Sequence, residues 1–579
     1  MHHGVFIVDY KSMRSDILII GAGGAGMRAA IAACEKGADV IIVTKSLIGK
    51  AHTVMAEGGI AASIADVDKA DNWETHFSDT IVEGVYIGDW RMAELLAKEA
   101  PERVYELERY GAIFDRTDEG KIMQRAFGGH TYKRLCHIGD KTGLELIRTL
   151  EDKVLHSKAK IYDEIYITKL FIKDGRFAGA LGIEMRSGDF IFFNAKAIII
   201  STGGCGRVYK ITSNSWESTG DGLALAYNAG ARLKDMEMIQ FHPTGMVWPP
   251  GVRGLLVTES VRGEGGILLN TNHERFMLRY SPEKRELDAR DVVARSIYYE
   301  IKAGRGTAHG AVYLDISHKG ADFIKRKLPG MYSQFMEFAG VDITKEPMEV
   351  APTVHYQMGG IEVDPYTTST CVSGVFASGE VASGLHGANR LGGNSLADIL
   401  VFGKIAGDNA FEFVNGKEFT EVLSNEIESE IERVKGYIRE GGRNPYNLMD
   451  ELTTVMEDYV GIMRVGDDMR AAIKRIDDLK IRAREMGVRG TTKYNHGLLG
   501  CLEVENMLIV CEAIAKSALM REESRGGHTR SDFPKRRREW KRNIICYNNG
   551  GVMDFVTEPV PDLPDNLARL VKPEVYEDE

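Results

Sequence analysis

Near the N-terminus, apolar residues form two short runs, at 17–20 and 40–43, on either side of a glycine-rich turn and an alanine-rich stretch. Apolar runs without polar alternation are typical of strands buried on both faces of a parallel sheet. The alanine-rich stretch 27–36 predicts a helix, and the glycines before it predict a tight turn. The pattern therefore predicts a strand, a glycine turn, a helix and a second strand in that order.

The turn reads "GAGGAG" at 21–26 and fits the G-x-G-x-x-G fingerprint of a dinucleotide-binding βαβ unit. Gly21 permits the tight turn, Gly23 lets the backbone approach a pyrophosphate, and Gly26 lets helix and strand pack closely. Gly24 lies in the same turn, where the helix N-terminus offers N–H groups to the phosphate. These four glycines are the candidate pyrophosphate site.

The second strand ends at Thr44 and Lys45, where an NAD site would carry an acidic residue for the ribose hydroxyls. This replacement weighs against NAD. Further glycine-rich turns follow apolar runs at 202–204 and 220–222, and another precedes the helix expected from about residue 395. Any one of these turns could serve only to let neighbouring elements pack closely, but together they predict a dinucleotide-binding sheet assembled from distant segments.

Between 416 and 520 the apolar residues recur at helical spacing, as in "EVLSNEIESEIERVKGYI" and "DDMRAAIKRIDDLKIRAREM". We interpret this stretch as a structural helical bundle. A chain of 579 residues is too long for one ordinary core, so two to four domains are expected.

Charge and cysteine usage narrow the function classes. The net charge of −11 argues against a nucleic-acid partner, which would require a broad basic face. The seven cysteines are scattered without a C-x-x-C pair, which predicts reduced thiols and no disulfide framework, metal site or iron–sulfur site on this chain. No run of 18 apolar residues occurs, so no membrane span is expected.

The middle of the chain concentrates cationic and polar side chains despite the acidic overall charge. They are two histidines, three arginines and a hydroxyl beside a carboxylate: His242, His355, Arg262, Arg290, Arg390, Thr258 and Glu259. Such a set suits a small dianion. Taken singly, each has a plainer interpretation: a histidine before Pro243 is commonly structural, and Arg290–Asp291 would be a surface salt bridge of little energy.

Seven strings together resemble the flavoprotein subunit of succinate dehydrogenase and fumarate reductase. They are "HTVMAEGGI", "QFHPTG", "TESVRGEGG", "RDVVARSI", "PTVHYQMGG", "GLHGANRLGGNSL" and "REESRGGHTRSDFP". They occur in the family's order and extend over roughly residues 14–550.

The resemblance implies an α/β fold: a Rossmann-like FAD-binding domain with an inserted α+β capping domain, then a helical domain and a small C-terminal domain. The expected boundaries are 14–238 and 355–415 for the two parts of the FAD-binding domain, 239–354 for the capping domain, 416–530 for the helical domain and 531–579 for the C-terminal domain.

The resemblance also implies the chemistry, which is hydride transfer between flavin and the two carbons of succinate or fumarate. Arg290 matches the arginine that exchanges a proton with the substrate carbon, and Glu259 and Arg262 match a relay to solvent. A nearby cation and desolvation would disfavour the charged form of a guanidinium and make it a better acid. The implied substrate-binding residues are His242, Thr258, His355, Arg390 and Phe127.

The implied cofactor is FAD, bound covalently through His52. Such a bond makes the flavin a stronger oxidant, which succinate oxidation needs. The other implied FAD-binding residues are Gly21, Gly23, Gly24, Gly26, Thr44, Lys45, Thr53, Gly58, Gly59, Asp221, Glu380, Ser395 and Leu396. Ser395 and Leu396 would present a helix N-terminus to the electron-rich edge of the flavin.

Two positions depart from the family pattern. His130 stands where many dehydrogenase members carry glutamine, and Lys50–Ala51 stand where an arginine–serine pair is common. The first departure predicts a different loop near the substrate.

The resemblance implies that the chain works in a quinone-linked respiratory complex. Its implied partners there are one or more membrane anchor subunits and an iron–sulfur subunit. The chain would then lie peripherally on the cytoplasmic face of the cell membrane. The basic segment "PKRRREWKRN" at 534–543 is either a solvated face or a docking surface.

Two other functions are considered. L-aspartate oxidase shares the fold and several motifs, but it normally lacks the histidine at position 52 and binds flavin noncovalently. A non-enzymatic flavin-bearing scaffold would have no need of a complete dianion site.

Overall fold

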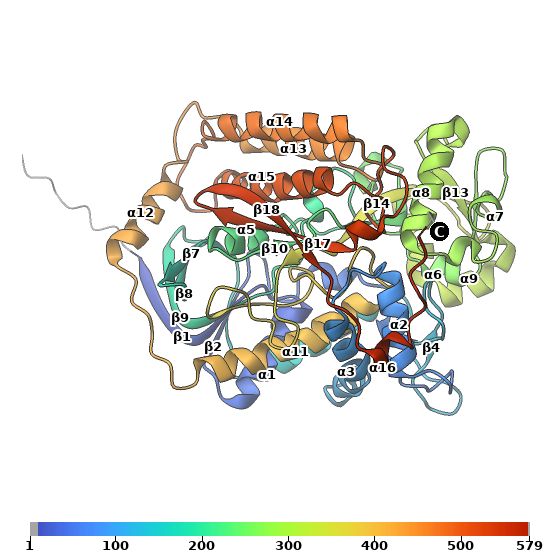
Figure 1. Ribbon diagram of the computed structural model, residues 1–579, viewed down its shortest axis with the longest axis horizontal. Coiled ribbons are helices and arrows are strands. Elements are labelled where there is room, and N and C mark those ends of the chain that lie inside the picture. Colours follow the sequence, from blue (N-terminus) through green and yellow to red (C-terminus); the bar gives the residue numbers. More distant parts are fainter. Residues whose placement is uncertain (1–9, 577–579) are drawn as a thin grey trace, which may run out of the picture.

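A seven-stranded sheet forms the centre of the computed structural model, which describes residues 10–576 (Figure 1). The strand order is β6-β2-β1-β9-β8-β7, and β16 pairs with the C-terminal half of β9. Their bounds are β1 (Lys11–Ile20), β2 (Val40–Val43), β6 (Lys160–Tyr162), β7 (Ile165–Lys173), β8 (Arg176–Glu184), β9 (Phe190–Ile200) and β16 (Val375–Ala377). β6, β2, β1, β9 and β16 are parallel, whereas β7 and β8 add antiparallel strands. The two strands predicted from the first apolar runs are confirmed, with Ile17 opposite Val40.

Side chains of β1 alternate between two hydrophobic cores, one on each face of this sheet. Ile17 and Ile19 face the core that includes the first helix, and Leu18 and Ile20 face the other. The helices of the first face are α1 (Gly24–Lys36), α3 (Trp90–Arg109), α4 (Thr142–Leu155) and α11 (Asn394–Val414). A further helix, α2 (Trp73–Glu83), packs against α3 in a separate hydrophobic cluster. The helices of the second face are α5 (Asp221–Asn228), α13 (Pro445–Tyr459), α14 (Gly466–Ala483) and α15 (His496–Met520), drawn above the sheet in Figure 1.

The stretch expected to cap the site has a hydrophobic core of its own. It is built on an antiparallel sheet of order β11-β14-β13-β12. The strands are β11 (Ile239–Met246), β12 (Ile267–Leu269), β13 (Val312–Asp315) and β14 (Met348–Gln357). The helices are α6 (Ser260–Gly263), α7 (Met277–Tyr280), α8 (Arg290–Glu300), α9 (Ala321–Lys327) and α10 (Pro329–Ala339). Figure 1 shows these elements together at one end of the molecule.

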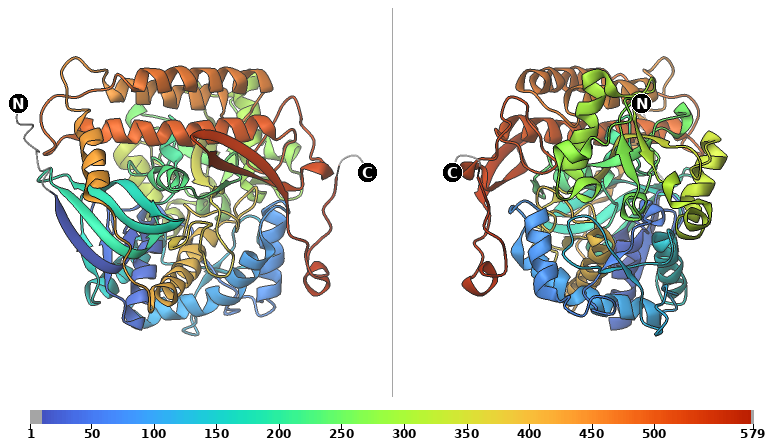
Figure 2. Two further views of the ribbon diagram at one scale, coloured as in Figure 1. Left: turned by 60° about the vertical axis from the view of Figure 1, so that its left-hand side comes forward. Right: turned by 90° about the vertical axis from the view of Figure 1, so that its right-hand side faces the viewer.

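The last part of the chain packs back onto the rest. After α12 (Ser424–Lys435) and the three long helices, the hairpin of β17 (Arg542–Asn549) and β18 (Val552–Pro559) joins β10 (Leu233–Lys234) and β15 (Gly360–Ile361) in one sheet. The short α16 (Asp565–Ala568) then packs its Leu567 against α2 and α3, partway along the extended C-terminal segment seen in Figure 2. The segment predicted as a small C-terminal domain therefore completes a sheet begun elsewhere.

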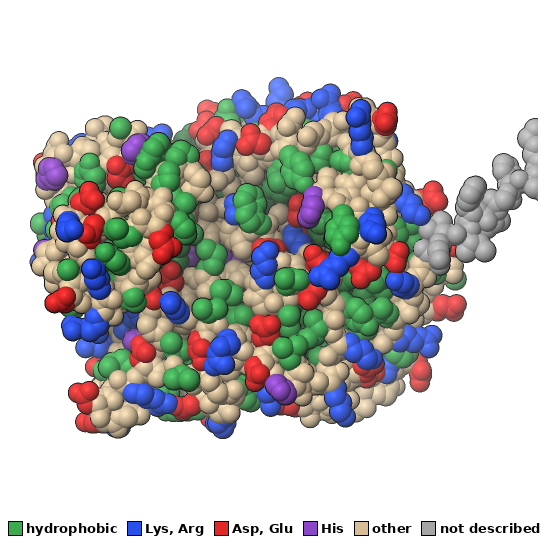
Figure 3. All heavy atoms as spheres, turned by 180° about the vertical axis from the view of Figure 1, so that it is seen from behind, with side chains coloured by type: hydrophobic (Ala, Val, Ile, Leu, Met, Phe, Trp, Pro, Cys, Tyr) green, Lys and Arg blue, Asp and Glu red, His purple; other side chains and the backbone are tan. Residues whose placement is uncertain are grey.

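The remaining elements are short. A three-stranded sheet is made of β3 (Ile60–Ala61), β4 (Gln124–Arg125) and β5 (Leu135–Cys136). Single turns are η1 (His52–Met55), η2 (Gly206–Val208), η3 (Pro250–Val252), η4 (Arg285–Leu287), η5 (Ile301–Arg305), η6 (Ser317–Lys319) and η7 (Arg538–Trp540). Within residues 10–576, no helix has both the length and the apolar character to cross a membrane. On the face drawn in Figure 3, acidic and basic side chains are interspersed rather than gathered into a basic field.

Candidate functional site

One large cavity of about 1600 Å³, its open mouth included, lies between the central sheet and the capping elements. Its wall combines the turn after β1, the η1 turn, the start of α11 and residues of β11 and β14. Twenty of the twenty-two predicted site residues line this cavity. The other two are Gly26, which lies behind the turn after β1, and Arg262, which lies behind Glu259. Sequence positions up to 375 residues apart, from Gly21 to Leu396, thus meet in one space.

The glycine turn is shaped by close backbone contacts. A Cβ on Gly26 would lie 1.9 Å from the carbonyl oxygen of Gly21, and one on Gly21 would lie 2.3 Å from that of Ser201. Gly21 also has a φ of +104°, which favours glycine. Gly23 precedes α1 as its N-cap residue, so the free N–H groups of the helix open onto the cavity. The turn therefore fits a pyrophosphate, as the fingerprint predicts.

Lys45 bridges the first βαβ unit to two distant helices. Its Nζ lies 2.7 Å from Oδ2 of Asp221, at the start of α5, and 3.0 Å from Oε1 of Glu503 on α15. Burial lowers the pKa of Lys45, but the two carboxylates outweigh burial and raise it above its ordinary value. The hydroxyl of Tyr166 donates to Asp221 over 2.8 Å. At the end of the cavity near Thr44, the charge of Lys45 is therefore paired with the carboxylates of Asp221 and Glu503.

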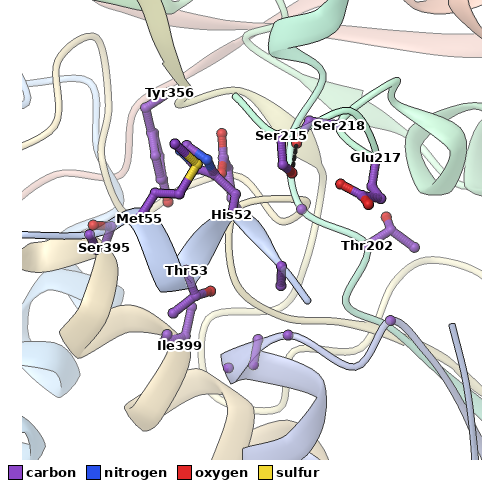
Figure 4. A pocket seen from close by; sticks show the side chains of 18 of the residues that line it. His52, Thr53, Met55, Thr202, Ser215, Glu217, Ser218, Tyr356, Ser395 and Ile399 are labelled. Atoms are coloured by element: carbon purple, nitrogen blue, oxygen red, sulfur yellow. Dashed lines mark hydrogen bonds between the residues drawn. The ribbon is translucent and has the colours of Figure 1, made fainter. Parts of the chain in front are cut away.

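His52 lies in the wall of the cavity with an unpartnered ring nitrogen. Its Nδ1 is buried and has no hydrogen-bond partner among the described residues. Burial, followed by the charges of Arg390 and Arg207, lowers its pKa to about 4, so the imidazole is neutral at pH 7. Figure 4 shows His52 between Ser395 on one side and Glu217 on the other. A neutral imidazole nitrogen free to bond fits a covalent attachment point.

The start of α11 forms the opposite edge of this part of the cavity. Ser395 and Leu396 belong to its first turn, and Ser395 Oγ accepts a hydrogen bond of 3.0 Å from Nη1 of Arg390. Glu380 also lines the cavity, where burial raises its pKa to about 7. The free N–H groups of a helix N-terminus favour negative charge, which suits a reduced flavin anion.

The capping strands contribute two neutral histidines. The ring centroids of His242 on β11 and His355 on β14 are 5.2 Å apart. Burial lowers the pKa of both rings well below the ordinary value. His242 Nε2 lies 3.0 Å from the carbonyl oxygen of Val257, and His355 Nδ1 lies 2.8 Å from Oγ of Ser213. Both rings are thus held in fixed orientations at the wall of the cavity, which Thr258 also lines.

Arg290, Glu259 and Arg262 form a buried ion cluster. Nε of Arg290 donates to Oε2 of Glu259 over 2.8 Å, and Nη2 of Arg262 lies 3.6 Å from the same oxygen. Burial raises the pKa of Glu259, but the two arginines and the Gly128 N–H outweigh burial and lower it. The salt-bridge interpretation of Arg290–Asp291 is wrong, because Asp291 pairs with Arg295 at 2.8 Å instead.

Arg390 adds a second guanidinium to the cavity. Its pKa falls to about 9, first because of burial and then because of the neighbouring charge of Arg290. The guanidinium lies 4.4 Å above the ring of Tyr356, and Phe127 lies beneath Arg290 at 5.8 Å. Two guanidiniums, two imidazoles and a threonine hydroxyl thus surround a space adjoining the glycine turn and His52. This arrangement can bind a small dianion against a flat cofactor.

Three residues at the site were given no role from the sequence. Gln240 lies two residues before His242 in the quoted "QFHPTG", and its amide oxygen accepts hydrogen bonds from Arg290 and Arg390. Glu57 lies in the quoted "HTVMAEGGI" and lines the cavity. The departure at His130 has a structural role, because its Nε2 lies 2.7 Å from the carbonyl oxygen of Gly392, just before α11. Gln240 and Glu57 lie within the quoted motifs, but nothing in the sequence of those motifs distinguished these two residues from the residues beside them.

Comparisons with known proteins find similar sequences along most of the chain. The family model described as "FAD binding domain" matches residues 16–396, and "Fumarate reductase flavoprotein C-term" matches residues 449–562. A subunit of the fumarate reductase (CoM/CoB) of Methanothermobacter marburgensis is 49% identical over 531 residues, which cover 92% of this chain and 96% of that protein. The "Succinate dehydrogenase flavoprotein subunit" of Coxiella burnetii is 39% identical over 562 residues, 93% of this chain and 95% of that protein.

Solved structures show the same similarity. A structure of E. coli quinol fumarate reductase superposes with a TM-score of 0.91 at 34% identity, covering 98% of this chain and 99% of that chain. Together with the family models, this similarity confirms the predicted fold class, an α/β FAD-binding fold followed by a C-terminal part.

Proposed function

Because the chain belongs to the family of succinate dehydrogenase and fumarate reductase flavoproteins, which are FAD oxidoreductases, we propose that it interconverts succinate and fumarate as one subunit of a respiratory complex. The observation that carries this proposal is the pair of guanidiniums, Arg290 and Arg390, joined through one amide oxygen in the cavity that also contains His52. A dicarboxylate offers two anionic ends to such a pair, and neutral His242 and His355 add directed hydrogen bonds.

Substrate binding and orientation are assigned to the capping strands and the loop before α11. His242, Thr258, His355 and Arg390 hold the two carboxylates, and Phe127 closes the space under Arg290. Burial of these groups excludes water and strengthens each charge-assisted hydrogen bond. The substrate carbons are thereby placed against the cofactor face.

Proton transfer is assigned to Arg290. In fumarate reduction Arg290 gives a proton to the substrate carbon, and in succinate oxidation it takes one. In succinate oxidation Glu259, whose carboxylate accepts the Nε–H of Arg290, takes the proton from Arg290 and passes it on past Arg262; in fumarate reduction Glu259 first receives a proton along the same path and then returns it to Arg290. The ionised state of Glu259 supports this role, since a carboxylate within hydrogen-bond distance is a competent proton acceptor.

FAD binding is assigned to the remaining residues that line the cavity. The glycine turn and α1 hold the pyrophosphate, while Thr44, Lys45 and Asp221 form the adenosine end. Thr53, Gly58, Gly59 and Glu380 lie along the flavin. His52 would bond to the flavin ring methyl, and its unpartnered neutral nitrogen supports this assignment. Bound FAD supplies the two-electron redox step.

We also propose that the chain assembles with a membrane anchor and with an iron–sulfur subunit. The relatives are named as subunits, and one solved neighbour is a quinol fumarate reductase. A quinone is therefore the proposed final electron carrier, although the M. marburgensis relative is named for CoM/CoB. In such a complex the chain lies on the cytoplasmic face of the cell membrane, held there by its partners.

Steady-state turnover with artificial dyes tests the proposal. The purified chain is expected to oxidise succinate with an oxidising dye and to reduce fumarate with a reduced dye. L-aspartate serves as the comparison substrate, because an L-aspartate oxidase would oxidise it in place of succinate. Turnover of L-aspartate alone would replace the proposal with that function, and turnover of none of the three would leave the chain without the proposed activity.

A further inference from the structure

Gln240 holds the two guanidiniums of the cavity on a single atom. It lies on β11 and is 1% exposed. Its Oε1 accepts from Nη1 of Arg290 over 3.2 Å and from Nη2 of Arg390 over 2.9 Å. Guanidinium groups can only donate hydrogen bonds, so the amide oxygen, not the NH2 group, must face them. Two like charges are thereby kept side by side in a buried space.

The amide group of Gln240 is fixed from its other side. Its Nε2 donates to Oδ1 of Asn389 over 2.8 Å and to the carbonyl oxygen of Arg390 over 2.9 Å. Asn389 is 1% exposed, and its own amide orientation follows from that contact. Its Nδ2 donates to Oε1 of Glu83 on α2 over 2.8 Å and to Oδ1 of Asp291 on α8 over 3.2 Å.

We propose that Gln240 is a positioning residue of the active site, and that Asn389, anchored on Glu83 and Asp291, fixes its orientation. The proposal rests on the proposed function of Arg290 and Arg390. The two arginines come from α8 and from the loop before α11, so no backbone connection sets their spacing. Glu259 holds Arg290 and Ser395 holds Arg390, but Gln240 Oε1 accepts from both and so offsets their mutual repulsion in a low-dielectric cavity.

Glu83 is the outer anchor of this chain of amides. No hydrogen bond or ion pair joins it to either guanidinium within residues 10–576. Burial and then the carboxylate of Asp291 raise its pKa to about 8, so its carboxyl is largely protonated at pH 7. A neutral amide at this position is therefore a close replacement, and it retains an oxygen for Asn389.

The first test compares Gln240→Met with Gln124→Met. Methionine preserves length and apolar volume but removes the shared oxygen. Gln124 is a matched control, because it is also buried but bonds only to backbone groups of the segment 62–67. Gln240→Met is expected to lose about 100-fold in kcat with fumarate and a reduced dye, since small misplacements of reacting groups cost that much. The control should retain wild-type kcat, and both should retain FAD.

The second test asks whether the two amides act as one unit. Asn389→Leu should lower kcat, and the double variant with Gln240→Met should lose no more than Gln240→Met alone, because both changes break the same chain. If the two substitutions damaged the protein independently, their fold losses in kcat would multiply in the double variant. That result would overturn the inference.

Glu83 provides a test that leaves the cavity lining intact. Glu83→Ala should lower kcat about 10-fold without loss of FAD. The loss is smaller than for Gln240→Met because Glu83 acts on the guanidiniums only through Asn389 and Gln240. Glu83→Gln should restore wild-type kcat by returning an acceptor to Asn389. This pair decides the question if Gln240→Met fails to fold. Wild-type kcat in Glu83→Ala, or in a folded Gln240→Met, would overturn this inference alone, whereas an inactive wild-type chain would overturn the proposed function and this inference with it.

Discussion

Nε of Arg290 donates to Oε2 of Glu259 over 2.8 Å, across 31 positions of sequence. The contact joins the first turn of α8 to the residue before α6 and lies in the cavity wall. It leaves the terminal nitrogens of Arg290 directed elsewhere, one of them to Gln240. An arginine held this way by its inner nitrogen can present its outer nitrogens to a substrate.

Replacement of Arg290 by lysine should therefore abolish most turnover. Arg290→Lys retains a charge but cannot bond to Glu259 and the substrate at once, because it lacks the planar fork. We expect FAD content to be unchanged, substrate binding to weaken, and kcat to fall by at least about 1,000-fold, the scale for loss of an acid–base group. Arg279→Lys, on the exposed side of the capping elements, should retain wild-type kcat. Near-normal turnover in Arg290→Lys would remove the proposed role.

The KM for fumarate should rise with pH through the titration of Glu57. Burial, and then the charge of Asp140, raise the pKa of Glu57 to about 8. Below that pH the carboxyl is neutral, and above it the carboxylate repels a dianion in the same cavity. We expect KM to rise about 10-fold between pH 7 and pH 9, the size of one unit of pKa coupling. Glu57→Gln should reduce this rise, and the remainder is expected from Glu380, whose pKa is about 7, and from Arg390, whose pKa is about 9. A profile identical to that of the wild-type chain in Glu57→Gln would contradict the assignment.

A methyl group at Gly26 should prevent FAD binding. Its Cβ would lie 1.9 Å from the carbonyl oxygen of Gly21, so the turn and α1 would have to separate. Backbone displacement of this kind costs about 1–3 kcal/mol in stability and distorts the pyrophosphate site. Gly26→Ala should show a low flavin-to-protein ratio and a lower Tm. Gly251→Ala, where a Cβ meets nothing within 4 Å, serves as the control. A full complement of FAD in Gly26→Ala would show that the close contact is not required.

Denaturation tests whether the flavin is bonded covalently to His52. After acid precipitation, the flavin fluorescence of the wild-type chain should stay with the polypeptide. His52→Ser should release all of it, whereas His318→Ser, at an exposed turn of the capping elements, should behave as wild type. Flavin released to the supernatant from the wild-type chain would exclude His52 as a covalent attachment point.

The hydrophobic pattern of the sequence predicted those elements that depend mainly on residues adjacent in sequence. The strand at 40–43 has the predicted bounds, whereas α1 begins at Gly24, three residues before the predicted helix, because glycines of the turn already adopt helical geometry. The role of Gln240 could not be predicted, because it depends on Arg390, which is 150 positions away. Arg290 and Asp291 do not pair, since adjacent residues on a helix point in different directions.

The C-terminal hairpin shows the same limit. Residues 542–549 and 552–559 form paired strands, but the other neighbour of the first strand is β10, a two-residue strand more than 300 positions earlier. Neither its pairing nor the docking of Leu567 against α2 and α3 leaves a local sequence pattern.

Anaerobic mixing of the oxidised, FAD-loaded chain with succinate tests the central claim most directly. The absorbance of the bound flavin reports its reduction in a single turnover, with no dye or partner protein involved. We predict that succinate bleaches the flavin of the wild-type chain, that L-aspartate does not, and that Arg290→Lys stays yellow with either. A wild-type flavin that stays oxidised with succinate, or that is bleached by L-aspartate instead, would contradict the proposed function.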